Sequence, residues 1–352
     1  MVHRSKPTSK VVVTGAAGFI GSHLVDALLA TDTTVVGFDN FDPWYNPAIK
    51  LANLDMARDH PRFRLVTATL GDPDVDLHNL FTAADVIYHL AGRPGVQTSW
   101  GHQFKETVDS NLTATQAVFE AALSAGVQRV VFASSSSVYG ECNGPGHPPQ
   151  SNPPQSSPSV GVASRPIAPI SPYGVTKAAA EQLASVYVKR GLDIISLRYF
   201  TVYGPRQRPD MAIHRLLEAT YENGLPFTKR GSGNQRRAFT HVSDIVSATI
   251  AAGHSPLPAG DIFDVGGSSM ISVNQLIDII ENLTGRAVDL VQIPLPAGDP
   301  ALVTPNTGPT VQKLGWAPQV GIEAGLADQY AANRNNSNQT KATASRYPMA
   351  SR

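Results

Sequence analysis

The sequence lacks the features of secreted, membrane-bound and nucleic-acid-binding proteins. Its 352 residues include one cysteine, Cys142, which excludes an intramolecular disulfide and a cysteine-based metal cluster. Charged residues make up only 16%, and 28 Lys and Arg balance 28 Asp and Glu, so no overall field exists to hold nucleic acid. No apolar run approaches the roughly 18 residues of a membrane helix, and the ten His show no metal-binding spacing. We therefore expect a cytoplasmic protein without a bound metal that binds neither nucleic acid nor a membrane.

The order of the predicted elements indicates an α/β fold. Short β-branched runs alternate with helical patterns, and strands that alternate with helices pair in parallel through right-handed crossovers. We expect strands at residues 11–13, 34–38, 63–67, 86–90, 130–133, 194–197 and 262–265, and helices at 22–30, 113–125, 172–189, 214–222 and 273–283. These elements predict a Rossmann-type, doubly wound parallel sheet with a smaller, partly interleaved C-terminal α/β lobe.

Composition suggests how the chain is divided. The strands and helices of the sheet predict a first domain over residues 8–200 with 238–268, and the remainder a second lobe over 201–237 with 269–330. Residues 143–171 are crowded with Pro, Ser and Gly, which is typical of a long surface loop. Residues 333–352 are rich in Asn, Ser and Thr, and we expect a disordered tail there.

A glycine-rich turn follows the first predicted strand. Gly15, Gly18 and Gly21 lead into a helix, a pattern in which glycine allows a tight turn and close approach of the backbone to a pyrophosphate. The helix N-terminus then offers unpaired N–H groups and a partial positive charge to the phosphates. By itself, this spacing also fits an ordinary turn into a helix.

The end of the next predicted strand favours NAD as the ligand. Asp39 lies 18 residues after Gly21, where a carboxylate binds the hydroxyls of the adenosine ribose. A site for NADP would place a cation here to meet the 2′-phosphate, and Asn40 and Phe41 follow instead. The alternative is that Asp39 is an ordinary turn residue.

Tyr173 and Lys177 are four residues apart, which places a phenol and an ammonium on one face of a helix. The ordinary pKa of tyrosine is about 10, so tyrosine is a poor base at neutral pH. A nearby ammonium stabilises the phenolate and makes Tyr173 a usable proton acceptor. Such a pair also arises by chance on protein surfaces. Serines at 134–137 follow another strand, at the edge where doubly wound folds bind ligands.

Seven motifs in this order resemble the extended short-chain dehydrogenase/reductase family, and within it the NAD-dependent nucleotide-sugar epimerases and dehydratases. They are GAAGFIG at 15–21, HLAG at 89–92, SNL at 110–112, SSSSVYG at 134–140, YGVTK at 173–177, RYFTVYGPRQRPDM at 198–211 and RRAFTHVSDIV at 236–246. The resemblance covers about residues 10–330. It implies NAD as the cofactor, a UDP-sugar as the substrate and a homodimer formed through the helices at 113–125 and 172–189.

The resemblance also assigns roles to individual residues. Ser135 would bind the substrate hydroxyl and share its proton with Tyr173, and Lys177 would also hold the nicotinamide ribose, so these three are the expected catalytic residues. The first domain would bind NAD and the second lobe the nucleotide sugar. Contacts with NAD are expected from Gly15, Gly18, Phe19, Ile20, Gly21, Asp39, Asn40, Leu70, Leu90, Ala91, Gly92, Asn111, Tyr173 and Lys177. Contacts with the substrate are expected from Ser136, Ser137, Thr201, Arg208 and Arg237.

Several reactions of this family remain open, and all begin with oxidation of the sugar at C4. The 4-keto sugar can take the hydride back on its other face, lose water across C5–C6, or lose CO2 where C5 carries a carboxylate. Dehydratases of the family carry Asp-Glu directly after the catalytic serine, and decarboxylases carry Glu at the second position. Ser136 and Ser137 stand here, and neither is a general acid or base near pH 7. A 4-epimerase is therefore favoured.

The substrate is predicted from the PRQRPDM run. Arg208 matches the arginine that meets the glucuronate carboxylate in UDP-glucuronate 4-epimerases, and Thr201 stands where glucose-type enzymes commonly have Asn. UDP-glucuronate is the first expectation. The alternative is UDP-glucose or UDP-N-acetylglucosamine, with Arg208 in a loop ion pair. A decarboxylase, a 4,6-dehydratase or a non-enzymatic dinucleotide-binding protein is less favoured. Two departures from the family pattern, Ala238 for Asp and Pro296 for Arg, bear on nucleotide binding.

Overall fold

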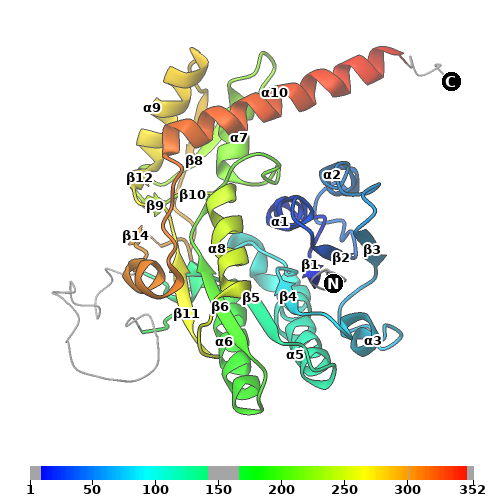
Figure 1. The fold of residues 1–352 in the computed structure, drawn as a ribbon. Coiled ribbons are helices and arrows are strands. Elements are labelled where there is room, and N and C mark those ends of the chain that lie inside the picture. Colours follow the sequence, from blue (N-terminus) through cyan, green and yellow to red (C-terminus); the bar gives the residue numbers. More distant parts are fainter. Residues whose placement is uncertain (1–8, 142–165, 301, 347–352) are drawn as a thin grey trace.

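The computed structural model describes residues 9–141, 166–300 and 302–346, with side chains to residue 335. Its centre is a seven-stranded sheet in the order β11-β6-β5-β4-β1-β2-β3, in which all neighbours are parallel (Figure 1). The strands are β1 (Lys10–Thr14), β2 (Thr34–Asp39), β3 (Phe63–Thr67), β4 (Val86–His89), β5 (Arg129–Ser135), β6 (Ile194–Tyr199) and β11 (Ile262–Val265). The predicted Rossmann-like α/β fold is confirmed, and the strand order reverses beside β1, where open α/β sheets bind ligands.

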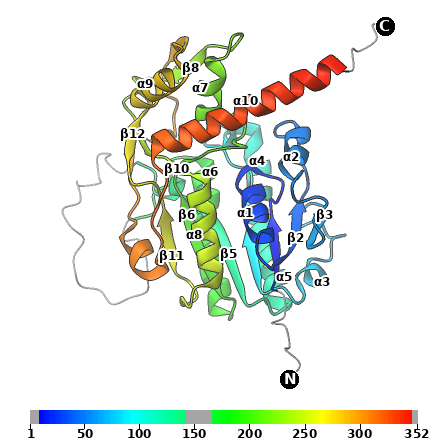
Figure 2. The ribbon, with the colours of Figure 1, turned by 45° about the horizontal axis from the view of Figure 1, so that its top comes forward.

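Helices cover both faces of this sheet (Figure 2). They are α1 (Phe19–Leu29), α2 (Pro47–Asn53), α3 (Leu77–Phe81), α4 (Phe104–Val108), α5 (Ala114–Ser124), α6 (Pro172–Lys189) and α8 (Val242–His254). Apolar side chains of α1 and α8 form one core with the sheet, and those of α3, α5 and α6 form a second core on the other face. Because the central strands are buried on both faces, their sequences are continuous apolar runs rather than alternating ones.

A smaller lobe stands beyond the carboxyl ends of the strands. Its helices and strands are α7 (Ala212–Ala219), α9 (Val273–Thr284), β7 (Val202–Tyr203), β8 (Phe227–Arg230), β9 (Arg236–Ala238), β10 (Thr240–His241), β12 (Met270–Ser272), β13 (Leu290–Ile293) and β14 (Leu302–Val303). The strands form one three-stranded and two two-stranded sheets. Helices α7, α9 and α10 (Ile322–Arg346) share a core built around Leu216, Leu276 and Leu326. The exact division of the chain into two domains stays a prediction.

Two predicted helices differ from the structure by two residues or more at an end. Helix α1 begins at Phe19, three residues before the predicted start, because Gly18 is its N-cap and the helix grows directly out of the glycine turn. Helix α7 spans 212–219 instead of 214–222. The chain turns back at Gly224, where an added Cβ would lie 2.1 Å from the carbonyl oxygen of Glu218.

The structure places residues 333–346, where a disordered tail was predicted, in helix α10. The first turns of this helix are anchored by Leu326 and Gln329, both fully buried. No Pro or Gly interrupts the sequence between Gly325 and Pro348, so the helix continues beyond its anchored turns. Residues 347–352, and residues 142–165 with most of the predicted surface loop at 143–171, lie outside the described residues.

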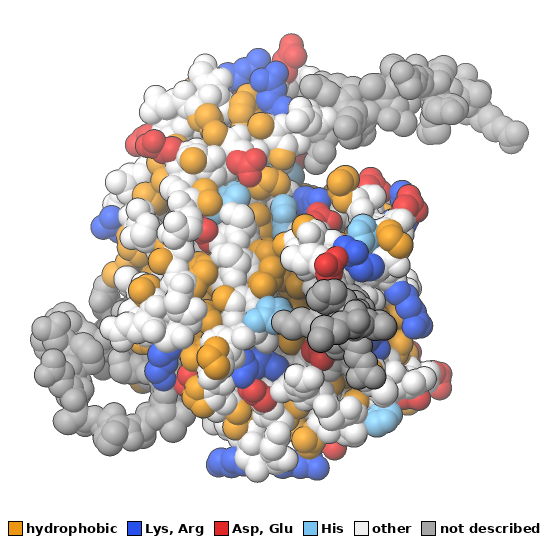
Figure 3. All heavy atoms as spheres, viewed as in Figure 1, with side chains coloured by type: hydrophobic (Ala, Val, Ile, Leu, Met, Phe, Trp, Pro, Cys, Tyr) orange, Lys and Arg blue, Asp and Glu red, His pale blue; other side chains and the backbone are white. Residues whose placement is uncertain are grey.

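The surface of the described chain matches its balanced composition. On the face shown in Figure 3, basic and acidic side chains are interspersed, and neither sign dominates. Within the described ranges, no helix combines the length and apolar character that crossing a bilayer requires.

Candidate active site

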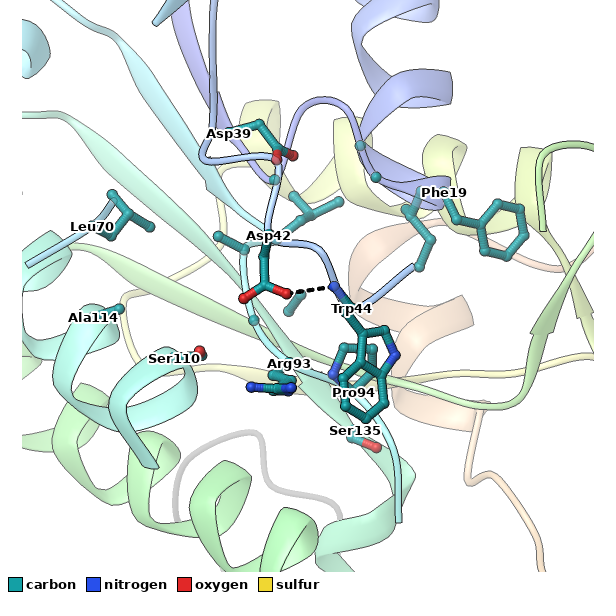
Figure 4. A pocket seen from close by; sticks show the side chains of 18 of the residues that line it. Phe19, Asp39, Asp42, Trp44, Leu70, Arg93, Pro94, Ser110, Ala114 and Ser135 are labelled. Atoms are coloured by element: carbon teal, nitrogen blue, oxygen red, sulfur yellow. Dashed lines mark hydrogen bonds between the residues drawn. The ribbon is translucent and has the colours of Figure 1, made fainter. Parts of the chain in front are cut away.

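A cavity of about 820 Å3 lies along the carboxyl ends of the strands. The turns after β1–β6, the start of α6 and the loop before α7 line it, and Figure 4 shows part of this lining. The predicted site residues that line the cavity are Gly15, Gly18, Phe19, Ile20, Gly21, Asp39, Asn40, Leu70, Leu90, Ala91, Gly92, Ser135, Ser136, Ser137, Tyr173, Lys177, Thr201 and Arg208. Asn111 and Arg237 are not part of the lining.

The glycine turn is shaped to receive a phosphate. Gly15 has a φ of +71°, and a Cβ on Gly21 would lie 2.0 Å from the Gly15 carbonyl oxygen, so only glycine lets α1 pack directly on the turn. Gly18, the N-cap of α1, has no side chain to bond the first N–H groups of the helix. These N–H groups therefore remain for a diphosphate.

Asp39 stands at the end of β2 with its carboxylate held in place. Oδ2 accepts a hydrogen bond from the Ala17 N–H (3.1 Å), and Oδ1 accepts one from the Phe41 N–H (2.8 Å). Each carboxylate oxygen can accept a further hydrogen bond, which suits a pair of ribose hydroxyls. Lys50, whose Nζ lies 3.6 Å from Oδ1, also lines the cavity. Sequence reasoning missed it because it belongs to α2, eleven residues further on. The residues present fit a dinucleotide.

Ser135, Tyr173 and Lys177 converge on the same cavity. Burial raises the pKa of Tyr173 above its usual value, while a hydrogen bond with the Ser135 side chain and the charge of Arg208 act in the opposite direction. Burial lowers the pKa of Lys177 to about 8, and the charge of Glu181 opposes this shift. The site thus combines a phenol, a hydroxyl hydrogen-bonded to it and an ammonium whose pKa is lowered by burial.

The start of α6 explains the position of Tyr173. Pro172 occupies the first turn, and the Ser171 hydroxyl caps the helix by accepting the Gly174 N–H (3.1 Å). The Tyr173 N–H donates to the Ser99 hydroxyl (3.0 Å). A Cβ on Gly174 would lie 2.5 Å from the Ser137 carbonyl oxygen, so glycine lets the helix start directly against the serine turn.

A buried ionic network behind Lys177 was missed by the sequence analysis. Glu181, one turn further along α6, accepts a hydrogen bond from Ser134 (2.5 Å) and binds Arg198 through both carboxylate oxygens (2.8 and 2.6 Å). Arg198 also donates to the Tyr139 hydroxyl (2.7 Å). Glu181 and Arg198 are 3% and 1% exposed. The spacing of Lys177 and Glu181, four residues on one helix, was the only available signal.

The end of the cavity where substrate is expected is lined by Ser136, Ser137, Thr201 and Arg208, and it has an aromatic wall. Trp44 donates its backbone N–H to Asp42 (2.8 Å), and the Arg93 guanidinium lies 4.4 Å from the centre of the Trp44 ring. Figure 4 shows Trp44, Arg93, Pro94 and Ser135 on this side of the cavity. Sequence reasoning missed Trp44 and Arg93 because neither stands in a motif that predicts this contact.

Comparisons with known proteins agree with this geometry. Residues 11–266 match the NAD dependent epimerase/dehydratase family. The chain is 38% identical to an uncharacterized UDP-glucose epimerase of Bacillus subtilis (92% of this chain, 97% of the relative) and 34% identical to the UDP-glucuronate 4-epimerase of Thermodesulfobacterium geofontis (90% and 93%). The structure of the Bacillus cereus UDP-glucuronic acid 4-epimerase with UDP-glucuronic acid and NAD superposes with a TM-score of 0.84, at 35% identity and 93% and 99% coverage.

The chain belongs to the NAD dependent epimerase/dehydratase family. Its cofactor is therefore NAD, as the glycine turn and Asp39 predict. The family assignment also confirms the resemblance on which the catalytic roles of Ser135, Tyr173 and Lys177 were predicted. Those individual roles remain predictions.

Two residues predicted to contact ligands, Asn111 and Arg237, lie outside the cavity lining in this epimerase/dehydratase chain, and their roles stay predictions. Asn111 is fully buried in a π-helical turn (Asp109–Thr113), where it accepts the Arg93 N–H (2.7 Å) and donates to the Arg93 carbonyl (3.0 Å). It therefore supports the wall of the cavity from behind. Arg237 forms an ion pair with Asp299 (2.5 Å) outside the lining, because β9 points it toward the loop before β14.

Proposed function

We propose that this chain interconverts UDP-glucuronate and UDP-galacturonate by epimerisation at C4 of the sugar. The observation that carries the proposal is the position of Arg208, a cation on the lining of the same cavity as Tyr173 and close enough for its charge to lower the pKa of that phenol. Asp210 already pairs with one edge of this guanidinium, and a neutral hexose offers no anion for the other edge. The carboxylate at C5 of a uronate does, one carbon away from the reacting C4.

The chain supplies the acid–base chemistry of the reaction. Tyr173 accepts the proton of the C4 hydroxyl, and Ser135 binds that hydroxyl and shares the proton. Lys177 stabilises the phenolate through its charge. The chemistry that bound NAD would supply is reversible acceptance of the C4 hydride. Gly18 and the start of α1 hold its diphosphate, and Asp39 holds its adenosine ribose.

The serine turn favours epimerisation over loss of water or CO2. Ser136 and Ser137 line the cavity directly after Ser135, at the positions where the related dehydratases and decarboxylases carry carboxylates. Serine hydroxyls are not general acids or bases near pH 7. The 4-keto sugar in this cavity therefore meets no second acid–base pair on that turn and returns to the 4-hydroxy form.

A panel of substrates tests the proposal. The protein is incubated separately with UDP-glucuronate, UDP-glucose and UDP-N-acetylglucosamine, and the products are separated and identified by mass and NMR. We expect UDP-galacturonate from the first and slower or no conversion of the other two. Faster conversion of UDP-glucose would favour the second candidate, a neutral-sugar 4-epimerase, which the likeness to the Bacillus subtilis relative supports. A UDP-pentose product would contradict epimerisation.

We also propose that the enzyme is a homodimer that pairs through α5 and α6. Val175 and Val186 are 48% and 52% exposed and lie on the same face of α6, three helical turns apart. Light scattering should give a mass in solution of about twice the chain mass of 37.4 kDa. The Val186→Asp variant should have a lower mass in solution. A wild-type mass equal to one chain would contradict the dimer.

A further inference from the structure

The loop between β7 and α7 contains a closed ion pair between residues two positions apart. Arg208 Nε donates to Asp210 Oδ1 and Nη2 donates to Oδ2, each over 2.9 Å. The side chain of Arg208 is 15% exposed and lines the cavity, whereas that of Asp210 is 44% exposed and does not. Asp210 therefore holds the guanidinium from outside the cavity and does not occupy the space that a substrate would fill.

This two-point contact leaves one edge of the guanidinium for a ligand. A guanidinium has five N–H groups in a planar fork, and Asp210 takes the Nε–H and one N–H of Nη2. Among the described residues, Nη1 has no hydrogen-bond partner. Nη1 and Nη2 together form a second edge, which matches a carboxylate with two parallel hydrogen bonds. Because the fork is rigid, fixing the first edge fixes the direction of the second.

Asp210 is itself held in place. Burial opposes its ionisation, but hydrogen bonding and charge from Arg208, together with hydrogen bonds from its own backbone and from the Trp44 side chain, lower the pKa of Asp210. Trp44 packs against Arg93, and the Arg93 backbone is bonded on both sides by Asn111. These contacts connect the Arg208 loop to the Rossmann sheet across the cavity.

We propose that Asp210 is a positioning residue that determines substrate specificity: it holds Arg208 so that the free guanidinium edge meets the C5 carboxylate of a uronate. The inference rests on the proposed function. Asp210 acts through Arg208 and touches neither substrate nor cofactor. A fixed arginine loses less side-chain freedom on binding than a mobile one. A neutral hydroxymethyl group at C5 gains little from this arrangement.

A double-mutant cycle tests the inference. KM and kcat are measured for wild type, Asp210→Ala, Arg208→Ala and the double variant, each with UDP-glucuronate and UDP-glucose. Asp210→Ala should raise KM for UDP-glucuronate about 10-fold or more, the scale of a charge-assisted hydrogen bond, and change KM for UDP-glucose by less than about twofold. The double variant should match Arg208→Ala, because Asp210 then has nothing to position.

Two further variants separate the positioning role from charge and folding. Glu218→Ala removes a carboxylate that is 51% exposed on α7, outside the cavity lining, and should change neither KM. Asp210→Asn keeps the size of the side chain and one hydrogen-bond acceptor. Its KM for UDP-glucuronate should lie between those of wild type and Asp210→Ala. Bound NAD and the melting temperature show whether each variant is folded.

The outcomes distinguish the two claims. A lower KM for UDP-glucuronate in Asp210→Ala would mean that the aspartate competes with substrate, and would overturn the inference. Equal rises in KM for UDP-glucuronate and UDP-glucose in Asp210→Ala would also overturn the inference. So would a double variant with a higher KM for UDP-glucuronate than Arg208→Ala. In both cases the proposed substrate stands. If wild type does not prefer UDP-glucuronate and Arg208→Ala leaves both sugars unchanged, the proposed substrate is wrong and the inference falls with it.

Discussion

Lys177 donates a hydrogen bond from Nζ to the backbone carbonyl oxygen of Ala133, 2.8 Å away. Ala133 lies on β5 two residues before Ser135, and Lys177 lies one turn after Tyr173 on α6. This bond therefore fixes the strand that carries the hydroxyl against the helix that carries the phenol. One contact between a side chain and the backbone thus links the two elements that carry the three groups proposed to move the C4 proton.

Replacing Tyr173 by Phe should abolish turnover but leave NAD bound. The phenol is the proposed proton acceptor, and positioned general bases contribute about 100- to 10,000-fold to rate, whereas the predicted NAD contacts are spread over many residues. Turnover is measured by NMR, and NAD is quantified after release from denatured protein. Tyr187→Phe is the matched control: this tyrosine lies on the same helix and bonds Glu120 and Gln116 outside the cavity. Near-normal turnover of Tyr173→Phe would contradict the mechanism.

Activity should fall above about pH 8. Burial lowers the pKa of Lys177 to about 8, so the ammonium that favours the Tyr173 phenolate is lost as the pH rises through that value. The measurement is kcat/KM against pH, which reports groups of the free enzyme. Samples returned to neutral pH before assay control for unfolding. A rate that stays constant up to about pH 10, the usual range of lysine, would contradict this role of Lys177.

Stability should fall as the pH drops below about 6.5, because of His89. This side chain is fully buried between Thr14 and Thr115 and lies outside the cavity lining. Burial lowers its pKa to about 3, so between about pH 6.5 and 3 the unfolded chain binds a proton that the folded chain does not. The free energy of unfolding should fall by about 2 kcal/mol between pH 7 and pH 5. Denaturant unfolding of His89→Gln should show a shallower acid dependence, and that of exposed His102→Gln an unchanged one. An identical acid dependence of wild type and His89→Gln would contradict this assignment.

An alanine at Gly21 should cost both stability and bound NAD. Its Cβ would lie 2.0 Å from the Gly15 carbonyl oxygen, a clash that the backbone must relieve by moving the phosphate turn; overpacking of this kind costs about 1–3 kcal/mol. Gly321→Ala is the control, since a Cβ there has nothing within 4 Å. The NAD content of the purified proteins and their melting temperatures are compared. Full NAD content in Gly21→Ala would show that the turn does not hold the cofactor.

The elements that surround the cofactor were predictable because local chemistry determines them. The run at 11–13 with Gly15, Gly18 and Gly21 predicts a strand, a turn and a helix, and Asp39 predicts the ribose end. The helix at 172–189 was predicted with its observed ends, and its start has a local cause in Pro172 and the Ser171 cap.

Contacts between distant segments were not predictable in the same way. The separation of Arg198 from Glu181 along the chain gives no sign that they form a buried pair. Arg237 was assigned to the substrate by the resemblance, and its ion pair with Asp299, 62 residues away, could not be foreseen. The sequence at 333–346 is polar and shows no apolar periodicity that would predict a helix. The helix there continues from turns anchored in the core, and amino-acid composition does not reveal that anchoring.

The most direct test of the account is proton NMR of the purified protein with UDP-glucuronate in D2O, without added cofactor. The account predicts UDP-galacturonate that retains its original hydrogen at C4, because a hydrogen carried as hydride does not exchange with water. Incorporation of solvent deuterium at C4, or the absence of UDP-galacturonate from protein shown to contain NAD, would contradict it.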